Sequence, residues 1–99
     1  MAITSSGLVK FKQALINLLQ QGQYTMDGKT YTTPIFKTTI DGDNVNVYLY
    51  LDDSVSGNIT QVQLIDRDGA VFDTQTENIS KPSINGLLIT FTYNLKKVV

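Results

Sequence analysis

The sequence predicts an α+β fold, in which an N-terminal amphipathic helix packs on an antiparallel β-sheet or small sandwich of about five strands. Two patterns lead to this prediction. Apolar residues recur at three- and four-residue spacing near the start of the chain, whereas later apolar residues alternate with polar ones in short runs. Residues typical of turns separate these runs, as in strands that fold back on one another.

The helix is predicted over about residues 5–21. Its apolar positions are Leu8, Phe11, Leu15, Ile16, Leu18 and Leu19. Ser5 or Ser6 can cap its start and Gly22 can end it, because serine oxygens accept from first-turn amides and glycine suits the position after a helix. A partner-binding or membrane-surface helix is the alternative to a core helix. Because this is the one strong helical pattern in the chain and the strands need a cover, we expect the helix to cover the last strand of the sheet. The residues expected in that contact are Leu8, Phe11, Leu15 and Leu19 of the helix and Leu87, Ile89 and Phe91 of the strand.

The strands are predicted over about residues 34–40, 45–51, 59–65, 70–76 and 86–95. Residues 23–33 break the pattern and are predicted to form a loop that holds at most a short strand. In the second strand Asn46, Tyr48 and Tyr50 share one face, which we expect to meet water or a neighbouring molecule while the opposite face enters the core. The last strand is the longest of the five and is expected to be central in its sheet.

Two of the predicted turns are rich in aspartate and glycine. The turn Asp66-Arg67-Asp68-Gly69 suits a type I turn closed by a bulge in which Gly69 is left-handed, so we expect Gly69 to be required there. The aspartates of this turn and of the segment Asp41-x-Asp43 are also of the type that binds calcium, because Ca²⁺ binds several carboxylate and carbonyl oxygens. Neither has the full spacing of a calcium-binding loop, so no metal site is predicted.

The composition narrows the function further. A chain of 99 residues is predicted to form a single domain, residues 1–99. Eight basic and nine acidic residues give a net charge of −1 without a basic cluster, so nucleic-acid binding is not expected. The sequence has no cysteine and no histidine, which removes disulfides, thiolate metal sites and the commonest general base.

No nucleophile motif or phosphate-binding loop stands out, and the carboxylates lie mostly in predicted loops, where solvated side chains are expected. We therefore predict that the protein is not an enzyme and has no catalytic or cofactor-binding residues. No window approaches the ~20 apolar residues needed to cross a bilayer, and no signal peptide is evident. The chain is thus expected to be made in the cytoplasm without membrane contact.

Tyrosines on the predicted strands are the candidate interaction residues. Tyr48, Tyr50 and Tyr93 each offer a broad ring with a polar tip, which suits an oligomer contact or a platform on which sugars stack. The alternative is that they are ordinary residues of a half-buried sheet face. The sequence alone leaves these alternatives open.

Three segments of the chain, in the same order, resemble the N-terminal domain of phage tail-collar fibre proteins. They are Ile3 to Leu8 at the start of the helix, Ile59 to Phe72 with its Asp-x-Asp-Gly turn, and Lys81-Pro82 before a last apolar strand. The chain departs from the family pattern at Gln61, Gln63 and Ile65, where the family favours glutamate, glycine and an aromatic residue. The resemblance implies a domain that attaches a fibre to the tail or baseplate of a phage particle.

The resemblance leads us to expect a non-enzymatic phage or prophage structural protein of the tail, fibre or baseplate. Such a protein would be made in the host cytoplasm, become part of the virion and act through subunit contacts at the Tyr48 and Tyr50 face or at unpaired sheet edges. The expected partners are other tail or baseplate proteins, and a homo-oligomer is a further option. The alternative function is a small carbohydrate-binding β-module used in host recognition.

Overall fold

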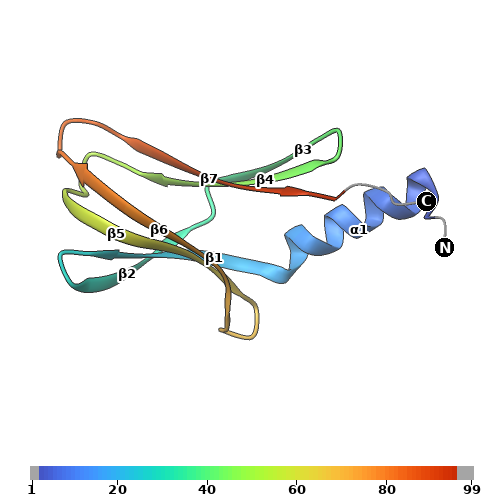
Figure 1. Cartoon of the computed structure of the whole chain (residues 1–99), viewed down its shortest axis with the longest axis horizontal. Coiled ribbons are helices and arrows are strands. Elements are labelled where there is room, and N and C mark those ends of the chain that lie inside the picture. Colours follow the sequence, from blue (N-terminus) through green and yellow to red (C-terminus); the bar gives the residue numbers. More distant parts are fainter. Residues whose placement is uncertain (1–2, 96–99) are drawn as a thin grey trace.

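In the computed structural model, which describes residues 3–95, one helix packs on two antiparallel sheets (Figure 1). The elements are α1 (Ser5–Leu18), β1 (Leu19–Met26), β2 (Lys29–Pro34), β3 (Lys37–Asp41), β4 (Asn44–Leu51), β5 (Gly57–Asp66), β6 (Val71–Lys81) and β7 (Leu87–Asn94). Sheet A has the strand order β2-β1-β5-β6, and sheet B has the order β3-β4-β7. The predicted class, a helix packed on antiparallel strands, is confirmed, although the strands number seven rather than about five.

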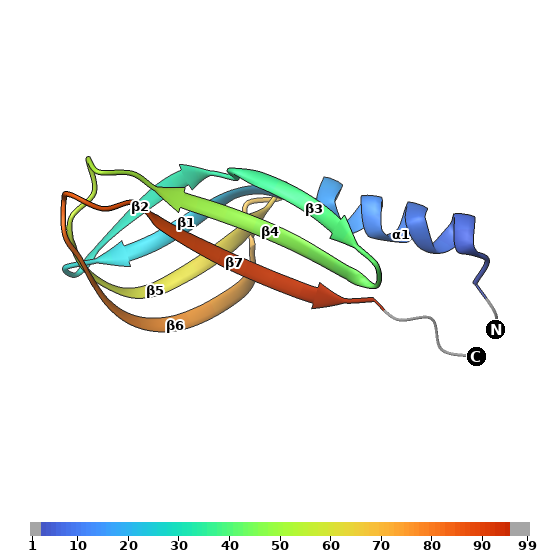
Figure 2. The same ribbon diagram turned by 90° about the horizontal axis from the view of Figure 1, so that it is seen from above.

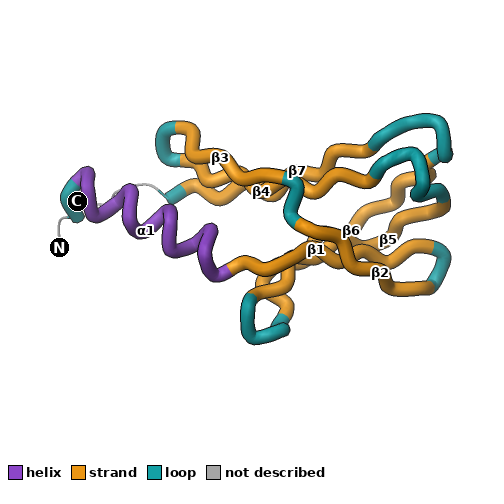
Figure 3. Tube along the Cα trace, turned by 180° about the vertical axis from the view of Figure 1, so that it is seen from behind, coloured by secondary structure: helices purple, strands orange, loops and turns teal. Residues whose placement is uncertain are grey.

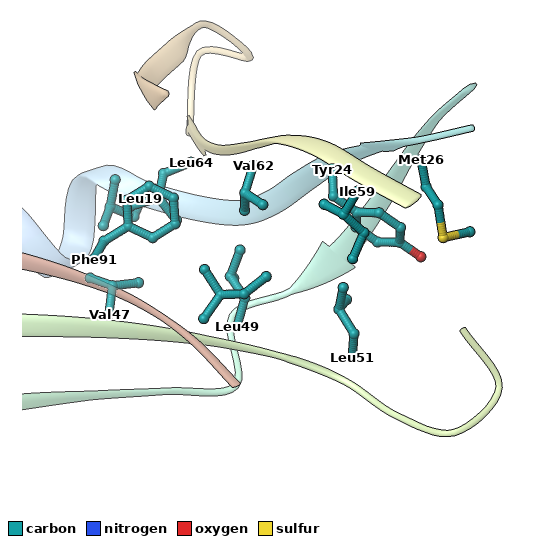
Figure 4. Packing of buried hydrophobic residues seen from close by; sticks show 11 residues of the cluster. Leu19, Tyr24, Met26, Val47, Leu49, Leu51, Ile59, Val62, Leu64 and Phe91 are labelled. Atoms are coloured by element: carbon teal, nitrogen blue, oxygen red, sulfur yellow. The ribbon is translucent and has the colours of Figure 1, made fainter. Parts of the chain in front are cut away.

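The two sheets face each other and enclose the core (Figure 4). Strand β4 alternates strictly, with its odd-numbered apolar residues buried and its asparagines and tyrosines turned outward. Sheet A supplies the facing layer, so period-two alternation in both sheets produces one shared apolar interior. The core residues are Leu19, Tyr24, Met26, Ile59, Val62 and Leu64 from sheet A and Val47, Leu49, Leu51, Ile89 and Phe91 from sheet B.

The helix ends three residues earlier than predicted. The prediction that residues 23–33 form a loop is wrong, because most of them lie in two strands. The chain passes directly from α1 into β1, and β1 and β2 form a hairpin around Asp27 and Gly28. Leu19 continues the helical period in the sequence, but it is the first residue of β1 and is buried between the sheets. Gly22 does not stop the helix. It lies inside β1 where a Cβ atom would come 2.5 Å from the Leu49 side chain, so the core requires a residue without a side chain there.

The helix does not lie across the sheet as predicted. It leaves the end of the sandwich, and the molecule is elongated, with extents of 47 × 26 × 19 Å (Figures 2 and 3). Leu87, Ile89 and Phe91 pack among strand residues, and no residue of α1 belongs to the buried core cluster. The predicted contact between helix and last strand is therefore wrong in its residues. The reason is that sheet A, which gains two strands from the missed hairpin, covers the face of sheet B that the helix was expected to cover.

The remaining strand boundaries also shift. Strands β5 and β6 are longer than predicted, because the hairpin around Gly69 continues to Gly57 on one side and to Lys81 on the other. The run predicted from 34 begins as a strand only at Lys37, since the chain crosses from sheet A to sheet B before it. Strand β7 lies at the edge of sheet B rather than at its centre.

Lys81 joins the end of β6 to the loop between β4 and β5. Its side chain is buried, and its ammonium donates hydrogen bonds to the backbone oxygens of Asp52 at 2.7 Å, Val55 at 2.6 Å and Pro82 at 3.2 Å. These carbonyls replace the water that a buried charge loses. The contact holds two loops together at the end of the sandwich opposite the helix (Figure 1).

Within residues 3–95, no helix combines the length and the hydrophobicity that crossing a membrane requires.

Candidate interaction surfaces

The structure brings two of the three candidate tyrosines together. Tyr48 and Tyr50 lie two residues apart on the outer face of β4, as their alternation predicts. Tyr93 lies on β7 opposite Val45 in the sheet register, with its ring turned to the inner side, where it packs against the core cluster. Tyr93 therefore does not share a surface with the other two.

The aromatic rings on the outer face of sheet B are in contact with other side chains of the same molecule. The ring centroids of Phe36 and Tyr50 are 5.4 Å apart, and the Lys37 ammonium lies 5.3 Å from the centroid of the Tyr48 ring. Tyr50 also lies so close to Gly86 that a Cβ atom there would clash with its ring. These rings are thus partly covered already, which leaves less of their faces open to a sugar or to a neighbouring subunit.

Short chains of amides and hydroxyls run across the outer faces of both sheets. On sheet B, Asn46 donates to Thr39 at 3.2 Å and accepts from Thr92 at 2.9 Å. On sheet A, Gln63 accepts from Gln23 at 2.9 Å and donates to Thr74 at 3.2 Å. Side chains that bond to one another across strands stabilise the pairing of those strands, so these polar rows need no ligand to explain them.

The edges of the two sheets are β2 and β6 in sheet A and β3 and β7 in sheet B. The β7 edge is partly blocked, because Gln75 of β6 donates a side-chain hydrogen bond of 3.3 Å to the backbone oxygen of Thr90. Two acidic residues of β6, Asp73 and Glu77, are half-buried on the side that faces sheet B. Inward-pointing charges of this kind oppose the addition of another strand, so we give the sheet edges less weight as docking surfaces.

An apolar groove opens between α1 and the nearby ends of β6 and β7. Its volume is about 310 Å³, and no charged side chain lines it. The lining residues are Phe11, Ala14, Leu15, Leu18, Phe72, Tyr93 and Leu95. Three of these are large and exposed: Phe11 by 56%, Leu18 by 53% and Phe72 by 38%. Apolar surface gathered in a groove is typical of a site that another molecule covers.

Polar contacts to both sheets hold α1 beside the groove. Lys12 is the buried residue of the helix, and its ammonium donates a 2.5 Å hydrogen bond to the backbone oxygen of Gly42 in the β3–β4 turn. On the other side, Arg67 in the β5–β6 turn donates from its side chain to the Asn17 oxygen at 2.6 Å and from its backbone to the Leu18 oxygen at 3.0 Å. Arg67 thereby satisfies carbonyls at the helix end that have no partner within the helix. The groove is accordingly built on a fixed helix.

Tyr93 and Phe72 form the side of the groove that belongs to the strands. Their rings meet edge to face with centroids 5.8 Å apart, and the Tyr93 hydroxyl donates a hydrogen bond to Asp73 Oδ2. Burial, and then the neighbouring Asp73 carboxylate, raise the pKa of Tyr93 above its usual value. The hydroxyl consequently stays protonated and is occupied by the protein itself.

The sequence indicates Phe11 as a core residue and does not single out Leu18 or Phe72 as a site. The helix sequence nevertheless contains a pattern that indicates an exposed apolar side. Its apolar residues occupy a wider arc than a helix lying on one sheet requires, because Phe11, Ala14 and Leu18 extend the stripe formed by Leu8 and Leu15. Phe72 has no such signal, since it lies where the β5–β6 register shifts.

The acidic turns are explained by backbone hydrogen bonds. Asp66 Oδ1 accepts from the amides of Asp68 at 2.9 Å and Ala70 at 3.0 Å, and Gly69 has a φ of +83°, the left-handed conformation that the turn motif predicts. In the loop after β4, a side-chain hydrogen bond and then a backbone hydrogen bond from Ser54 lower the pKa of Asp52. Within the part of the chain that the structure describes, no three acidic residues gather where they could hold a metal ion.

Comparison with protein-family models, with curated proteins and with solved structures gave no match for this chain.

Proposed function

We propose that this protein is a structural subunit of a phage or prophage particle, in the tail, fibre or baseplate, and that it works through contacts with other protein subunits rather than through catalysis. The sequence resemblance supports a role in a phage particle, and the apolar groove supports a surface for the subunit contact. The groove is the observation that carries the proposal, because two exposed helix residues, Phe11 and Leu18, wall an uncharged hollow on a helix held in place by Lys12 and Arg67.

The carbohydrate-binding alternative has less geometric support. A sugar that stacks on Tyr48 would compete with the Lys37 ammonium, and Tyr50 already contacts Phe36 and Gly86. The neighbouring amides and hydroxyls, which would have to bind sugar hydroxyls, bond to one another. Reproducible hits on a glycan array that disappear when Tyr48 and Tyr50 become alanine would reverse this preference.

The proposed function is tested by deleting the gene from its phage or prophage and restoring it from a plasmid. We expect the deletion to lower the yield of infectious particles, and we expect the wild-type chain to restore that yield and to be found in purified particles by mass spectrometry. The double variant Phe11→Gln with Leu18→Gln should fold but fail to restore the yield, because both side chains are more than half exposed and their loss affects the groove more than the core.

Leu88→Gln is the matched control, because Leu88 is an equally exposed apolar residue on the outer face of sheet B, away from the groove. This variant should restore the particle yield fully. Particles that lack the chain and are formed at the normal yield after the deletion would refute the proposed function.

A further inference from the structure

We propose that a second copy of this chain covers the groove, in a two-fold contact that pairs the two α1 helices antiparallel. This inference rests on the proposed function, since it names the partner for the same groove.

Helix α1 has apolar side chains for two partners. On one side Leu8, Leu15 and Ile16 are half-buried against the sandwich of the same chain. On the adjacent side Phe11 and Leu18 are mostly exposed. A helix that lies on a single surface needs an apolar stripe of about 100° or somewhat more, and this helix exceeds that width. The second side is therefore surface that the described part of the chain, residues 3–95, leaves exposed.

The occupant of the groove must present large apolar side chains. A cavity of about 150 Å³ holds one benzene-sized ring, so a groove of about 310 Å³ has room for about two side chains of that size. The same surface that contains the groove also presents Phe11 and Leu18 to solvent. Because Phe11, Leu18 and the groove lie on one face, a two-fold axis can relate two copies face to face. Phe11 and Leu18 of each copy then enter the groove of the other copy.

The order of residues along α1 favours antiparallel helices. Ala14 lies midway between Phe11 and Leu18, so an axis near Ala14 places Phe11 of each copy opposite Leu18 of the other. The small side chain at the centre lets the helix backbones approach closely. Lysine, glutamate or another long side chain at this position would keep the two helices apart.

The charge on α1 and the charge on the neighbouring β5–β6 turn are complementary in this arrangement. The exposed Lys10 lies one turn before Ala14, and α1 contains no acidic residue. The β5–β6 turn at the C-terminal end of the helix carries Asp66, Arg67 and the exposed Asp68, beside a hollow of about 300 Å³ that shares Leu18 and Phe72 with the groove. The Arg67 side chain is already bonded to the Asn17 oxygen, so Asp68 is the charge of this turn that we assign to the partner. Antiparallel pairing brings Lys10 of one copy next to Asp68 of the other, twice, across the axis.

Cysteine cross-linking tests this contact on the full chain, which has no cysteine of its own. With helix axes roughly 8–10 Å apart and Cα atoms about 2.3 Å from each helix axis, Cα atoms that face each other lie roughly 3.4–5.4 Å apart, a range that overlaps the roughly 4.4–6.8 Å that a disulfide spans. Ala14→Cys should therefore form disulfide-linked dimers rapidly under mild oxidation. Gln13→Cys, an exposed residue on the opposite side of α1, is the control and should form far fewer. Adding Phe11→Gln to Ala14→Cys should reduce cross-linking at least about tenfold, in line with loss of a central apolar contact.

Charge exchange tests the orientation of the helices. Lys10→Asp should weaken the dimer, and adding Asp68→Lys to the same chain should restore it, because each contact then regains opposite charges. Equal cross-linking of the two cysteine variants, or no recovery in the charge-exchanged chain, would overturn the two-fold contact. If the chain is nevertheless found in particles and needed for their yield, the groove binds a different virion protein and the proposed function stands. If the deletion test also fails, both are refuted.

Discussion

Replacing Phe91 by alanine is expected to lower the free energy of unfolding by about 4 kcal/mol, close to half the stability of an ordinary domain. Phe91 is only 1% exposed and lies in the cluster between the two sheets, among Val47 and Leu49 of its own sheet and Leu19 and Leu64 of the facing sheet (Figure 4). Alanine leaves a cavity that residues of two different sheets border, and paired strands cannot move inward to close it. Urea denaturation followed by circular dichroism measures the loss.

The matched control is Leu88→Ala on the same strand. Leu88 points to the outer face of sheet B and is about half exposed, so its removal should cost well under 1 kcal/mol. A loss for Leu88→Ala as large as that for Phe91→Ala would contradict the assignment of inner and outer faces on β7.

Replacing Lys81 by methionine should lower the free energy of unfolding by about 3 kcal/mol, although methionine has a similar size and is more apolar. The Lys81 ammonium donates hydrogen bonds to the backbone oxygens of Asp52, Val55 and Pro82, whereas methionine has no donor for any of them. The three carbonyls accept these hydrogen bonds in part-buried positions, and water replaces a charged donor there only incompletely. Because Lys81 is only 4% exposed, we expect little water to enter in its place.

Lys29→Met is the control, since Lys29 is an exposed lysine at the start of β2. That substitution should change the free energy of unfolding by no more than about 0.5 kcal/mol. Equal effects of the two substitutions would mean that the hydrogen bonds of Lys81 do not stabilise the fold.

The sequence predicts some strands well for an identifiable reason. In β4 and β7 every second residue is apolar and is buried or half-buried, because each strand has one face on the core and one on solvent. The hairpin around Gly69 can also be predicted from the sequence, since this type of turn requires a residue in the left-handed conformation and glycine adopts it readily. Such local rules hold whatever the rest of the chain does.

The hairpin of β1 and β2 could not be read in the same way. The apolar period of the helix runs on through Leu19, so the sequence contains no break where the helix becomes a strand. Gly22 occupies an inward position of β1 where a strand pattern would have an apolar side chain, because Leu49 of the facing sheet fills that space. Strand β2 is polar and mostly exposed, as suits an edge. Its assignment depends on contacts that only the folded chain reveals.

The same limit applies to the interaction surfaces. The sequence places Tyr48 and Tyr50 on one outer face, because alternation within one strand is enough for that. It cannot place Phe11 beside Phe72, since those residues are far apart in the chain and meet only because α1 leaves the end of the sandwich. Without β1 and β2, the sequence leaves the helix as the cover of the sheet, and the apolar side that the structure exposes is therefore predicted as core.

Sedimentation equilibrium of the full chain over a range of concentrations tests most directly the central claim that a second copy of the chain covers the groove. The account predicts that the average mass of the wild-type chain rises from 11.0 kDa toward twice that value as the concentration rises. The double variant Phe11→Gln with Leu18→Gln should stay at 11.0 kDa over the same range. A wild-type chain that remains at the monomer mass throughout, or a variant that associates as strongly as the wild type, would contradict the account.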